Sequence, residues 1–321
     1  MSKVRLSLEN LDPSFPEAGE LIHHVTSRVV MDQPLITGEA RDEFVRQIKI
    51  AAKFTGIKVL AYVIMPNHFH FLLAVPTQGP KLLEDKEFFR RVGPILTREA
   101  LADLRSEWKV ASPKKRAKLQ QDFFYRMHSL PEFAKNLVQR MTRFINRQHG
   151  RRGTLWQSRF RSSIIEEGFT AKAVRAYLHA NPVRAGLVTD PADYEWSSFA
   201  KARKSDRALA MQASLFALRN REPIPTRAAN SLEAALAVLQ PKFTQEDLDL
   251  AQAVSQTIRH FTDGFIVGSE DFVNRIFEAN RDHFSEGRAT GARSPMGPLK
   301  ILKGKIQSVR ALQLGLYEPK K

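Results

Sequence analysis

Two histidines separated by a single residue are the side chains of this chain best suited to chemistry. His68 and His70 lie in the segment Met65–Leu73, whose sequence is Met-Pro-Asn-His-Phe-His-Phe-Leu-Leu. Apolar residues on both sides predict two strands joined by a tight Pro-Asn turn. Because side chains alternate across a strand, both imidazoles project from one face and the neighbouring phenylalanines from the other. Two adjacent imidazoles form half of a divalent-metal site, although such a pair taken alone is more often two ordinary strand histidines.

A tyrosine and an asparagine one helical turn apart are the next candidates. Thr170–Ala180 has the apolar spacing of a short helix. We expect this helix to end at Asn181, because a residue that precedes proline resists the helical conformation. Tyr177 and Asn181 are four residues apart, so they share one face of the last turn, which is not the apolar face. A phenol and a carboxamide on that face can point together into a metal site, whereas Tyr177 taken alone would more often be a core residue.

The segments around these residues have the patterns of elements that can position them. Leu21–Val30 is rich in β-branched residues and predicts a first strand, and Gly38–Thr55 has the spacing of a helix. Pro131–Gln148 is the strongest amphipathic pattern in the chain, and a strand is expected from Leu155 to about Ile165. The predicted order is strand, helix, strand, strand, helix, strand, helix.

Residues 77–130 interrupt this order with a stretch of different character. The stretch is dense in charge and has helical patterns at Leu96–Trp108 and Arg116–Met127. It carries no chemical signature, and we interpret it as a helical insertion on the surface of the domain.

The composition changes again after residue 200, which predicts a helical extension over 201–321. Asn230–Leu239 and Thr244–Phe261 have helical patterns, and Ser269 is placed as the N-cap of a further helix. From Gly287 to Lys321 basic residues face a single acidic one, which is typical of a tail that follows phosphates or of a solubilising tail.

Basic residues also cluster around the amphipathic helix and the segment that follows it. Arginines interleaved with aromatic rings suit phosphate contacts combined with base stacking. For any one of these arginines a place on a solvated rim is equally plausible, but for the whole cluster it is less so. The candidate DNA-binding residues are Arg140, Arg143, Arg147, Arg151, Arg152, Trp156, Arg159 and Arg161.

The overall charge points to a polyanionic partner. The 321 residues include 50 Lys and Arg against 34 Asp and Glu, a formal net charge of +16 at pH 7. Nucleic acid is the first polyanion to consider at this charge. The chain has no cysteine, which excludes disulfides, thiolate catalysis and Cys-ligated zinc. Neither a signal peptide nor a membrane-spanning apolar segment is predicted, so we expect a cytoplasmic, nucleoid-associated protein with no membrane partner.

Four motifs in chain order resemble the REP-associated tyrosine transposases, which are the single-tyrosine branch of the HUH (His-hydrophobe-His) single-strand nucleases. The motifs are Met65–His70, Gly153–Phe160, Tyr177–Leu187 and Trp196–Ser198. The resemblance runs from about Leu21 to Phe199, with the insertion inside it. It implies an α/β (α+β) fold, a ferredoxin-like sandwich with an antiparallel sheet, over residues 18–200.

The resemblance also implies a role for each candidate residue. In that family the two histidines, here His68 and His70, hold a catalytic Mg²⁺ or Mn²⁺. The tyrosine one turn before the Asn-Pro pair, here Tyr177, is the nucleophile, and the residue four positions later, here Asn181, completes the metal site. The implied function is a transposase: a metal-dependent endonuclease and strand transferase that cleaves single-stranded DNA at REP repeat hairpins through a 5′-phosphotyrosine.

Several alternatives stay open at the level of sequence. A regulator that binds hairpin DNA or RNA without chemistry is one, and a replication-initiator nickase is another. The chain has no G-x-x-x-x-G-K-[S/T] motif, which disfavours an initiator fused to a helicase. A monomer and a homodimer that shares Tyr177 between subunits both fit. The base that activates Tyr177 is not identified, and His179 is a weak candidate because a residue two positions away points elsewhere.

Overall fold

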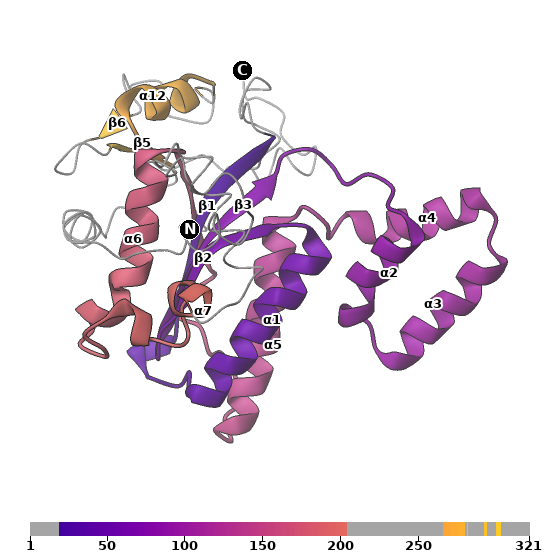
Figure 1. The fold of residues 1–321 in the computed structure, drawn as a ribbon, viewed down its shortest axis with the longest axis horizontal. Coiled ribbons are helices and arrows are strands. Elements are labelled where there is room, and N and C mark those ends of the chain that lie inside the picture. Colours follow the sequence, from indigo (N-terminus) through magenta and orange to yellow (C-terminus); the bar gives the residue numbers. More distant parts are fainter. Residues whose placement is uncertain (1–18, 204–265, 280, 282–291, 294–299, 303–321) are drawn as a thin grey trace, which may run out of the picture.

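A computed structural model of the chain describes residues 19–203, 266–279, 281, 292–293 and 300–302 (Figure 1). The helices expected at 230–239 and 244–261 lie outside the described residues, as does most of the basic tail. Among the helices that the structure does describe, none has both the length and the apolar character needed to cross a bilayer.

Four antiparallel strands form the centre of the fold. They are β1 (Glu20–Arg28), β2 (Lys58–Ile64), β3 (His68–Pro76) and β4 (Arg161–Ile165), in the order β2-β3-β1-β4. One helix connects β1 to β2, a tight turn connects β2 to β3, and several helices connect β3 to β4. This is the ferredoxin-like order, and the α+β fold predicted from the sequence is confirmed.

Helices cover both faces of this sheet (Figure 1). Helices α1 (Gly38–Thr55) and α5 (Leu130–Gln148) pack against each other over one face, with Phe69 and Phe71 of β3 in the core beneath them. Helix α6 (Phe169–Arg184) covers the other face, where the ring of its Tyr177 lies against His70. The histidines and phenylalanines of β3 therefore alternate between the two faces, as the spacing predicted.

Helix α1 has the predicted bounds and the predicted terminal glycine. Thr37 caps its N-terminus by accepting a hydrogen bond from the Ala40 amide. At its C-terminus Gly56 has φ +75°, the left-handed conformation that ends a helix at low cost when the residue is glycine. Beyond this turn, the His128 amide donates to the Thr55 carbonyl, which attaches the end of the insertion to the end of α1.

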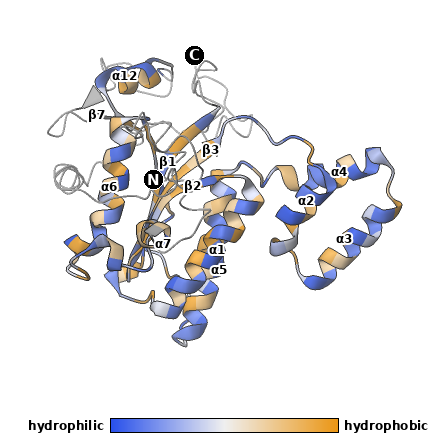
Figure 2. Cartoon of the chain, in the orientation of Figure 1, coloured by the Kyte–Doolittle hydropathy of each residue, from blue (hydrophilic) through white to orange (hydrophobic). Residues whose placement is uncertain are grey.

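The insertion is a small helical arm that projects from the α1 and α5 side of the molecule (Figure 1). Two of its helices, α3 (Arg98–Val110) and α4 (Pro113–Phe124), were predicted, whereas α2 (Asp85–Val92) and the short η3 (Gly93–Ile95) were not. Hydrophilic residues lie along much of its outer surface (Figure 2). Apolar side chains from all three α-helices pack against Phe54 of α1 in a separate small core.

The strand predicted to begin at Leu155 begins only at Arg161. The segment before it pairs with the end of β1 only briefly. The Val30 amide donates to the Leu155 carbonyl and the Gln157 amide to the Arg28 carbonyl, and Val29 and Trp156 form an isolated bridge. Pairing is therefore limited to this one bridge, and the adjacent residues Leu155 and Trp156 are both buried.

Helix α6 continues past the point where it was predicted to end. Pro182 lies inside the helix, and the Ala185 amide donates to the Asn181 carbonyl one turn further on. Proline removes one helical hydrogen bond and disfavours the helical conformation of the preceding residue. Here Asn181 and Pro182 are both buried against the sheet, and we attribute the continuation of the helix to this packing.

The described residues after α6 extend the sheet as well as adding helix. After η4 (Pro191–Asp193) and α7 (Ser198–Arg203), strand β5 (Ile266–Gly268) pairs parallel to β4. Two short strands, β7 (Lys300–Leu302) and β6 (Ala292–Arg293), then follow it at the edge of the sheet. Helix α12 (Glu270–Ala279) is preceded by Ser269, whose hydroxyl accepts a hydrogen bond from the Phe272 amide, as an N-cap does.

Candidate active site

The two candidate histidines begin β3, directly after a turn that is held on both sides. The Met65 amide donates to the His68 carbonyl across the turn. The Val29 amide donates to the Asn67 carbonyl, and the Ile36 amide donates to that of Pro66. Backbone hydrogen bonds from three segments therefore fix the position from which both imidazoles project.

A neighbouring side chain holds the Nδ1 atom of each imidazole. His68 Nδ1 is 2.6 Å from Asn67 Oδ1, and His70 Nδ1 is 3.0 Å from His24 Nε2. The rings of His68 and His70 lie nearly perpendicular, with their centroids 5.0 Å apart. Because Nδ1 is engaged in both rings, Nε2 is the nitrogen of each that suits a metal.

Helix α6 brings the tyrosine and the asparagine to the same place. The ring centroid of Tyr177 is 5.5 Å from that of His70, with the planes inclined at 75°. The Asn181 side chain is hydrogen-bonded to His68, and its Nδ2 donates to the Tyr177 carbonyl at 3.2 Å. His68, His70, Tyr177 and Asn181 thus form one cluster between β3 and α6. The sequence predicted that Tyr177 and Asn181 lie on a face distinct from the apolar face of the helix. This prediction is wrong, because both residues are buried together with the apolar ones.

Both histidines are held in the neutral form. Burial, followed by the nearby Arg28 guanidinium, lowers the pKa of His68 to about 4, and the hydrogen bond to Asn181 opposes this shift. Burial lowers the pKa of His70 well below its ordinary value, and the imidazoles of His68 and His24 act in the same direction. Neutral imidazole is the form that ligates a metal.

The donor set suits a divalent cation that works on an anion. Within the described residues no group of three His, Asp or Glu side chains is arranged to hold a metal ion, so the donors here are two imidazoles and a carboxamide. None of these ligands carries a negative charge, which would leave the charge of a bound cation available to a phosphate. Both imidazoles are neutral, and both have Nδ1 held by a partner. The residues present therefore fit the metal that the sequence resemblance implies.

Two arginines that were not among the predicted site residues border the cluster. Arg28 is the last residue of β1 and stands directly opposite His68 in the β1–β3 register. It is ion-paired with Asp32 at 3.0 Å, but both side chains are more than half exposed. Arg184, at the end of α6, lies with its Cζ atom 5.3 Å from the centre of the Tyr177 ring. The sequence could have identified Arg184, because it lies seven residues, or two helical turns, after Tyr177. Arg28 could be identified only from the strand register.

His179 does not face this cluster. Its Nε2 is 3.3 Å from the Ser198 hydroxyl, and its ring packs against Phe199 with the centroids 5.1 Å apart. Burial lowers its pKa to about 3. It joins α6 to α7 in the core, so it is not in a position to take a proton from Tyr177.

The predicted DNA-binding arginines are divided between the two faces of the sheet. Helix α5 carries three of them, Arg140, Arg143 and Arg147, and this helix covers the face opposite to α6. Arg151, Arg152 and Arg159 belong to the connection between α5 and β4. Arg161 stands opposite Thr26 of β1, and Thr26 stands opposite His70. Because directly opposed residues share a face, Arg161 alone of the eight is placed by strand register on the face of the histidines.

Trp156 is a core residue. Its exposed fraction is 6%, its indole N–H donates to the Thr142 hydroxyl at 2.9 Å, and its ring packs edge-on against Phe69. Base stacking needs an open ring face, so the burial of this ring does not fit that predicted role. The indole instead anchors the start of the 155–160 segment to α5.

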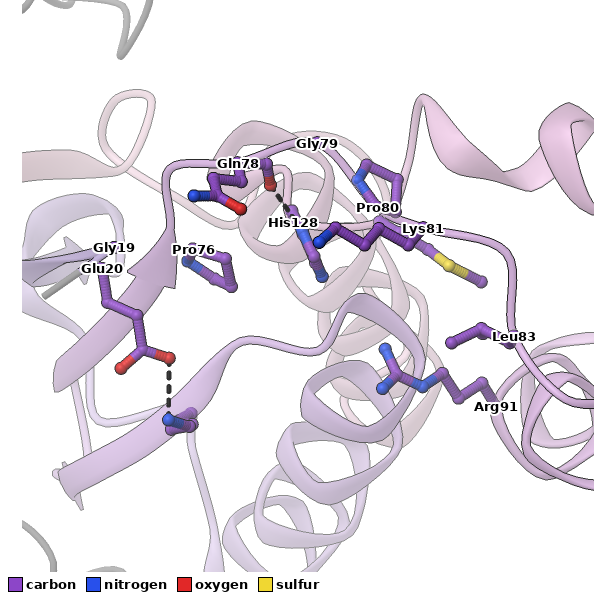
Figure 3. Close-up of a pocket in the computed structure, with 12 residues that line it drawn as sticks. Gly19, Glu20, Pro76, Gln78, Gly79, Pro80, Lys81, Leu83, Arg91 and His128 are labelled. Atoms are coloured by element: carbon purple, nitrogen blue, oxygen red, sulfur yellow. Dashed lines mark hydrogen bonds and ion pairs between the residues drawn. The ribbon is translucent and has the colours of Figure 1, made fainter. Parts of the chain in front are cut away.

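A separate cavity of about 550 Å³ lies at the far end of the sheet (Figure 3). It is bordered by Glu20 and Pro76, which pair eight residues along β1 and β3 from Arg28 and His68, roughly 26 Å away at ~3.3 Å per residue. Two of its cations are already paired: Lys58 with Glu20 at 2.8 Å and Arg91 with Glu87 at 2.7 Å. We assign no part of the chemistry to this cavity.

Comparisons with known proteins give a distant structural likeness. No family model and no curated protein matches the chain. Among solved structures, a REP-associated tyrosine transposase bound to a REP hairpin is similar with a TM-score of 0.36 and 14% sequence identity. The match covers 64% of this chain and 86% of that one. A likeness this distant carries no functional conclusion, which has to come from the site itself.

Proposed function

We propose that this protein is a metal-dependent endonuclease and strand transferase that acts on single-stranded or hairpin DNA, with Tyr177 as its nucleophile. The observation that carries the proposal is the meeting of Tyr177 and Asn181 with His68 and His70. These four side chains come from two elements about a hundred residues apart in sequence. A phenol, two neutral imidazoles and a carboxamide form a set that suits phosphoryl transfer.

Tyr177 acts by displacement at phosphorus. Its phenolic oxygen forms a bond to the phosphorus atom while the bond from phosphorus to the 3′-oxygen of the preceding nucleotide breaks. The phenol loses its proton, the departing oxygen gains one, and the products are a 5′-phosphotyrosine and a free 3′-hydroxyl. The phosphodiester bond is exchanged and not hydrolysed, so a second 3′-hydroxyl can reverse the step without ATP.

The metal site of this proposal consists of His68 Nε2, His70 Nε2 and the Asn181 side-chain oxygen. A divalent cation held there would offset the negative charge of the phosphate oxygens and fix the phosphate for in-line attack. Imidazole ligands favour Mn²⁺ over Mg²⁺, but the ligand set admits both. The contacts of Asn67 and His24 with the two Nδ1 atoms support this role, because they leave Nε2 of each imidazole for the cation.

Arg28 and Arg184 are the groups that receive the phosphate. They belong to different elements, Arg28 to the end of β1 and Arg184 to the end of α6. Each places a permanent positive charge beside a candidate catalytic side chain, His68 or Tyr177. Fixed cations aimed at the charge that develops on a transferring phosphate lower the barrier most where water is excluded, and Tyr177 is only 3% exposed.

One observation favours a second function, binding without chemistry. Tyr177 and Asn181 are both buried, and Asn181 donates to the backbone carbonyl of Tyr177. Two side chains that only stabilise the end of α6 would have the same surroundings. A hairpin-binding regulator would keep the basic surface and would not need the tyrosine hydroxyl.

The hydroxyl of Tyr177 therefore provides the deciding experiment. Wild-type protein and Tyr177→Phe are incubated with a labelled single-stranded hairpin and Mn²⁺ and separated on a denaturing gel. We expect wild type to form a covalent protein–DNA adduct, and Tyr177→Phe to form none while binding the hairpin equally well. Addition of EDTA should also abolish the adduct.

A matched control is Tyr62→Phe, which removes the hydroxyl of another buried tyrosine. This variant should still form the adduct. If wild type binds hairpins with no adduct under any metal, the regulator is the correct function. An adduct that persists in Tyr177→Phe would move the nucleophile to another tyrosine.

A further inference from the structure

His24 lies next to the metal site of the proposed function but is not among its ligands. It is a residue of β1, two positions before Thr26, and Thr26 stands directly opposite His70 of β3. Because alternate residues of a strand share a face, His24 projects on the same side of the sheet as His70. Its exposed fraction is 1%, so the contact that its Nε2 makes with His70 is shielded from water.

The contact between the two imidazoles is specific in both distance and orientation. His24 Nε2 is 3.0 Å from His70 Nδ1, and both atoms are buried. The ring planes are inclined by only 15°, with their centroids 5.1 Å apart. A histidine that merely filled space in the core would need neither the hydrogen bond nor the parallel alignment.

The direction of this hydrogen bond decides which nitrogen of His70 can bind a cation. A neutral imidazole carries one proton, so one ring nitrogen donates and the other has a free lone pair. If Nδ1 of His70 donates to His24, its Nε2 lone pair faces the cluster. If Nδ1 of His70 accepts instead, its Nε2 carries the proton and cannot ligate a metal.

We propose that His24 is a positioning residue that accepts a hydrogen bond from His70 Nδ1 and thereby keeps the His70 Nε2 lone pair directed at a divalent cation. This inference rests on the metal site of the proposed function. Asn67 Oδ1 accepts a hydrogen bond from His68 Nδ1 in the same way, because a carboxamide oxygen can only accept. Each histidine ligand then has one partner that fixes both its tautomer and its ring orientation.

Mn²⁺ affinity is the first measurement, made on the full chain without DNA by electron paramagnetic resonance of the free ion. His24→Leu introduces an apolar side chain of similar size and removes the acceptor, Nε2 of His24. We expect it to bind Mn²⁺ about 10- to 100-fold more weakly than wild type. His24→Gln places a carboxamide oxygen near the position of Nε2, and should bind within a few-fold of wild type.

The matched control is His23→Leu, since His23 is the adjacent histidine on the same strand. Its side chain points to the opposite face, where Nδ1 is 3.1 Å from the Ser162 hydroxyl. This variant should bind Mn²⁺ as wild type does. Circular dichroism and thermal melts establish whether each of the three variants is folded.

The protonation state of His70 is the second measurement, and it needs no metal. Long-range ¹H–¹⁵N spectra of the metal-free protein distinguish the two tautomers of each histidine. We expect His70 to carry its proton on Nδ1 in wild type and in His24→Gln, and to lose this preference in His24→Leu.

The outcomes separate the two proposals. Wild-type protein that binds no Mn²⁺ would overturn the metal site, while the tautomer of His70 would still test His24. If His24→Leu binds Mn²⁺ as tightly as wild type, or if His70 carries its proton on Nε2, the role of His24 is overturned. A His24→Gln variant as weak as His24→Leu would also overturn it, because the imidazole of His24 would then be acting as a ligand itself.

Discussion

The surroundings of His68 and His70, more than their neighbours in sequence, make them suitable metal ligands. Any His-x-His on a strand places two imidazoles on one face. In this protein burial also lowers the pKa of both, and a partner on each Nδ1 leaves Nε2 as the nitrogen available to a metal. A pair of exposed strand histidines would have neither property.

Removal of either imidazole should separate chemistry from binding. We expect His68→Ala and His70→Ala to lose cleavage of a labelled hairpin, because each removes one ligand of the cation. DNA affinity, measured by fluorescence anisotropy, should change by less than a few-fold, because both imidazoles are neutral and the substitutions remove no basic residue. His128→Ala, at the opposite end of the sheet, is the control and should cleave normally. Cleavage by either variant in chelating buffer would contradict a metal-dependent mechanism.

Arg184 should affect the rate of cleavage more than the affinity for DNA. No ion pair of Arg184 is found within the described residues. Its guanidinium lies over the Tyr177 ring. Loss of one group that stabilises the transferring phosphate costs on the order of 100-fold in rate. We expect Arg184→Ala to show this loss in single-turnover cleavage and Arg184→Lys to recover part of it. Arg147→Ala removes an exposed arginine from α5, on the other face, and an equal loss there would show that only overall charge matters.

At the scale of elements, the ends of α6 and α1 are determined by different effects: tertiary packing in α6 and local backbone conformation in α1. In α6 the buried position of Pro182 coincides with a helix that continues where local preference would end it. At Gly56 local conformation prevails, because the helix ends in a left-handed residue, φ +75°, at the joint with the insertion. A different end of α6 would move Asn181 away from the histidines, and a different end of α1 would move the arm.

Substitution of Gly56 should destabilise the protein more than substitution of Gly150. Both glycines have positive φ, +75° and +61°, so an alanine at either is strained by on the order of 1 kcal/mol. A Cβ on Gly150 would meet nothing within 4 Å, whereas one on Gly56 would lie 2.8 Å from Arg91 Nη1 and 3.2 Å from the His128 ring. Urea unfolding of Gly56→Ala and Gly150→Ala measures the difference. If both variants had the same free energy of unfolding, Arg91 and His128 of the arm would be able to move away from the new Cβ without loss of stability.

At the scale of the whole molecule, positive charge is spread well beyond the candidate active site. The chain has a formal net charge of +16, and the basic residues of α5 lie on the face opposite the histidines. A long polyanion can contact several of these regions, while the proposed chemistry belongs to one of them. Such contacts position nucleic acid without reading its sequence.

The basic residues of the C-terminal tail should contribute to affinity and to its dependence on salt. Deletion from Gly287 onward would also remove β6 and β7 from the sheet, so charge neutralisation is the cleaner change. Glutamine in place of Lys303, Lys305, Arg310, Lys320 and Lys321 leaves both strands intact. For single strands the slope of log affinity against log salt should fall by about 0.7 for each phosphate that the tail no longer neutralises.

The control for this prediction is a variant of the insertion arm with the same change in net charge. Five basic residues of the arm are replaced by glutamine: Lys86, Arg98, Lys109, Lys114 and Lys118. If the tail binds DNA, its variant should have the smaller slope. Equal slopes in wild type and the tail variant would identify the tail as a solubilising segment.

The sequence by itself determined the properties that depend on near neighbours along the chain. Alternation along β3 placed His68 and His70 on one face, and helical spacing placed Tyr177 one turn from Asn181. The order of elements over the sandwich, the bounds of α1 and its terminal Gly56 followed from the same local patterns. These patterns reflect backbone geometry and the burial of one side of each element, and both act over a few residues.

The tertiary structure decided which distant side chains meet. Strand register sets Arg28 opposite His68 and brings His24 to His70, and no periodicity within a single segment contains that information. Packing buries Trp156, which the sequence alone could not distinguish from an exposed aromatic ring. Contacts between residues far apart in sequence depend on how complete faces fit together, and so the partners of the candidate site could be found only in the folded chain.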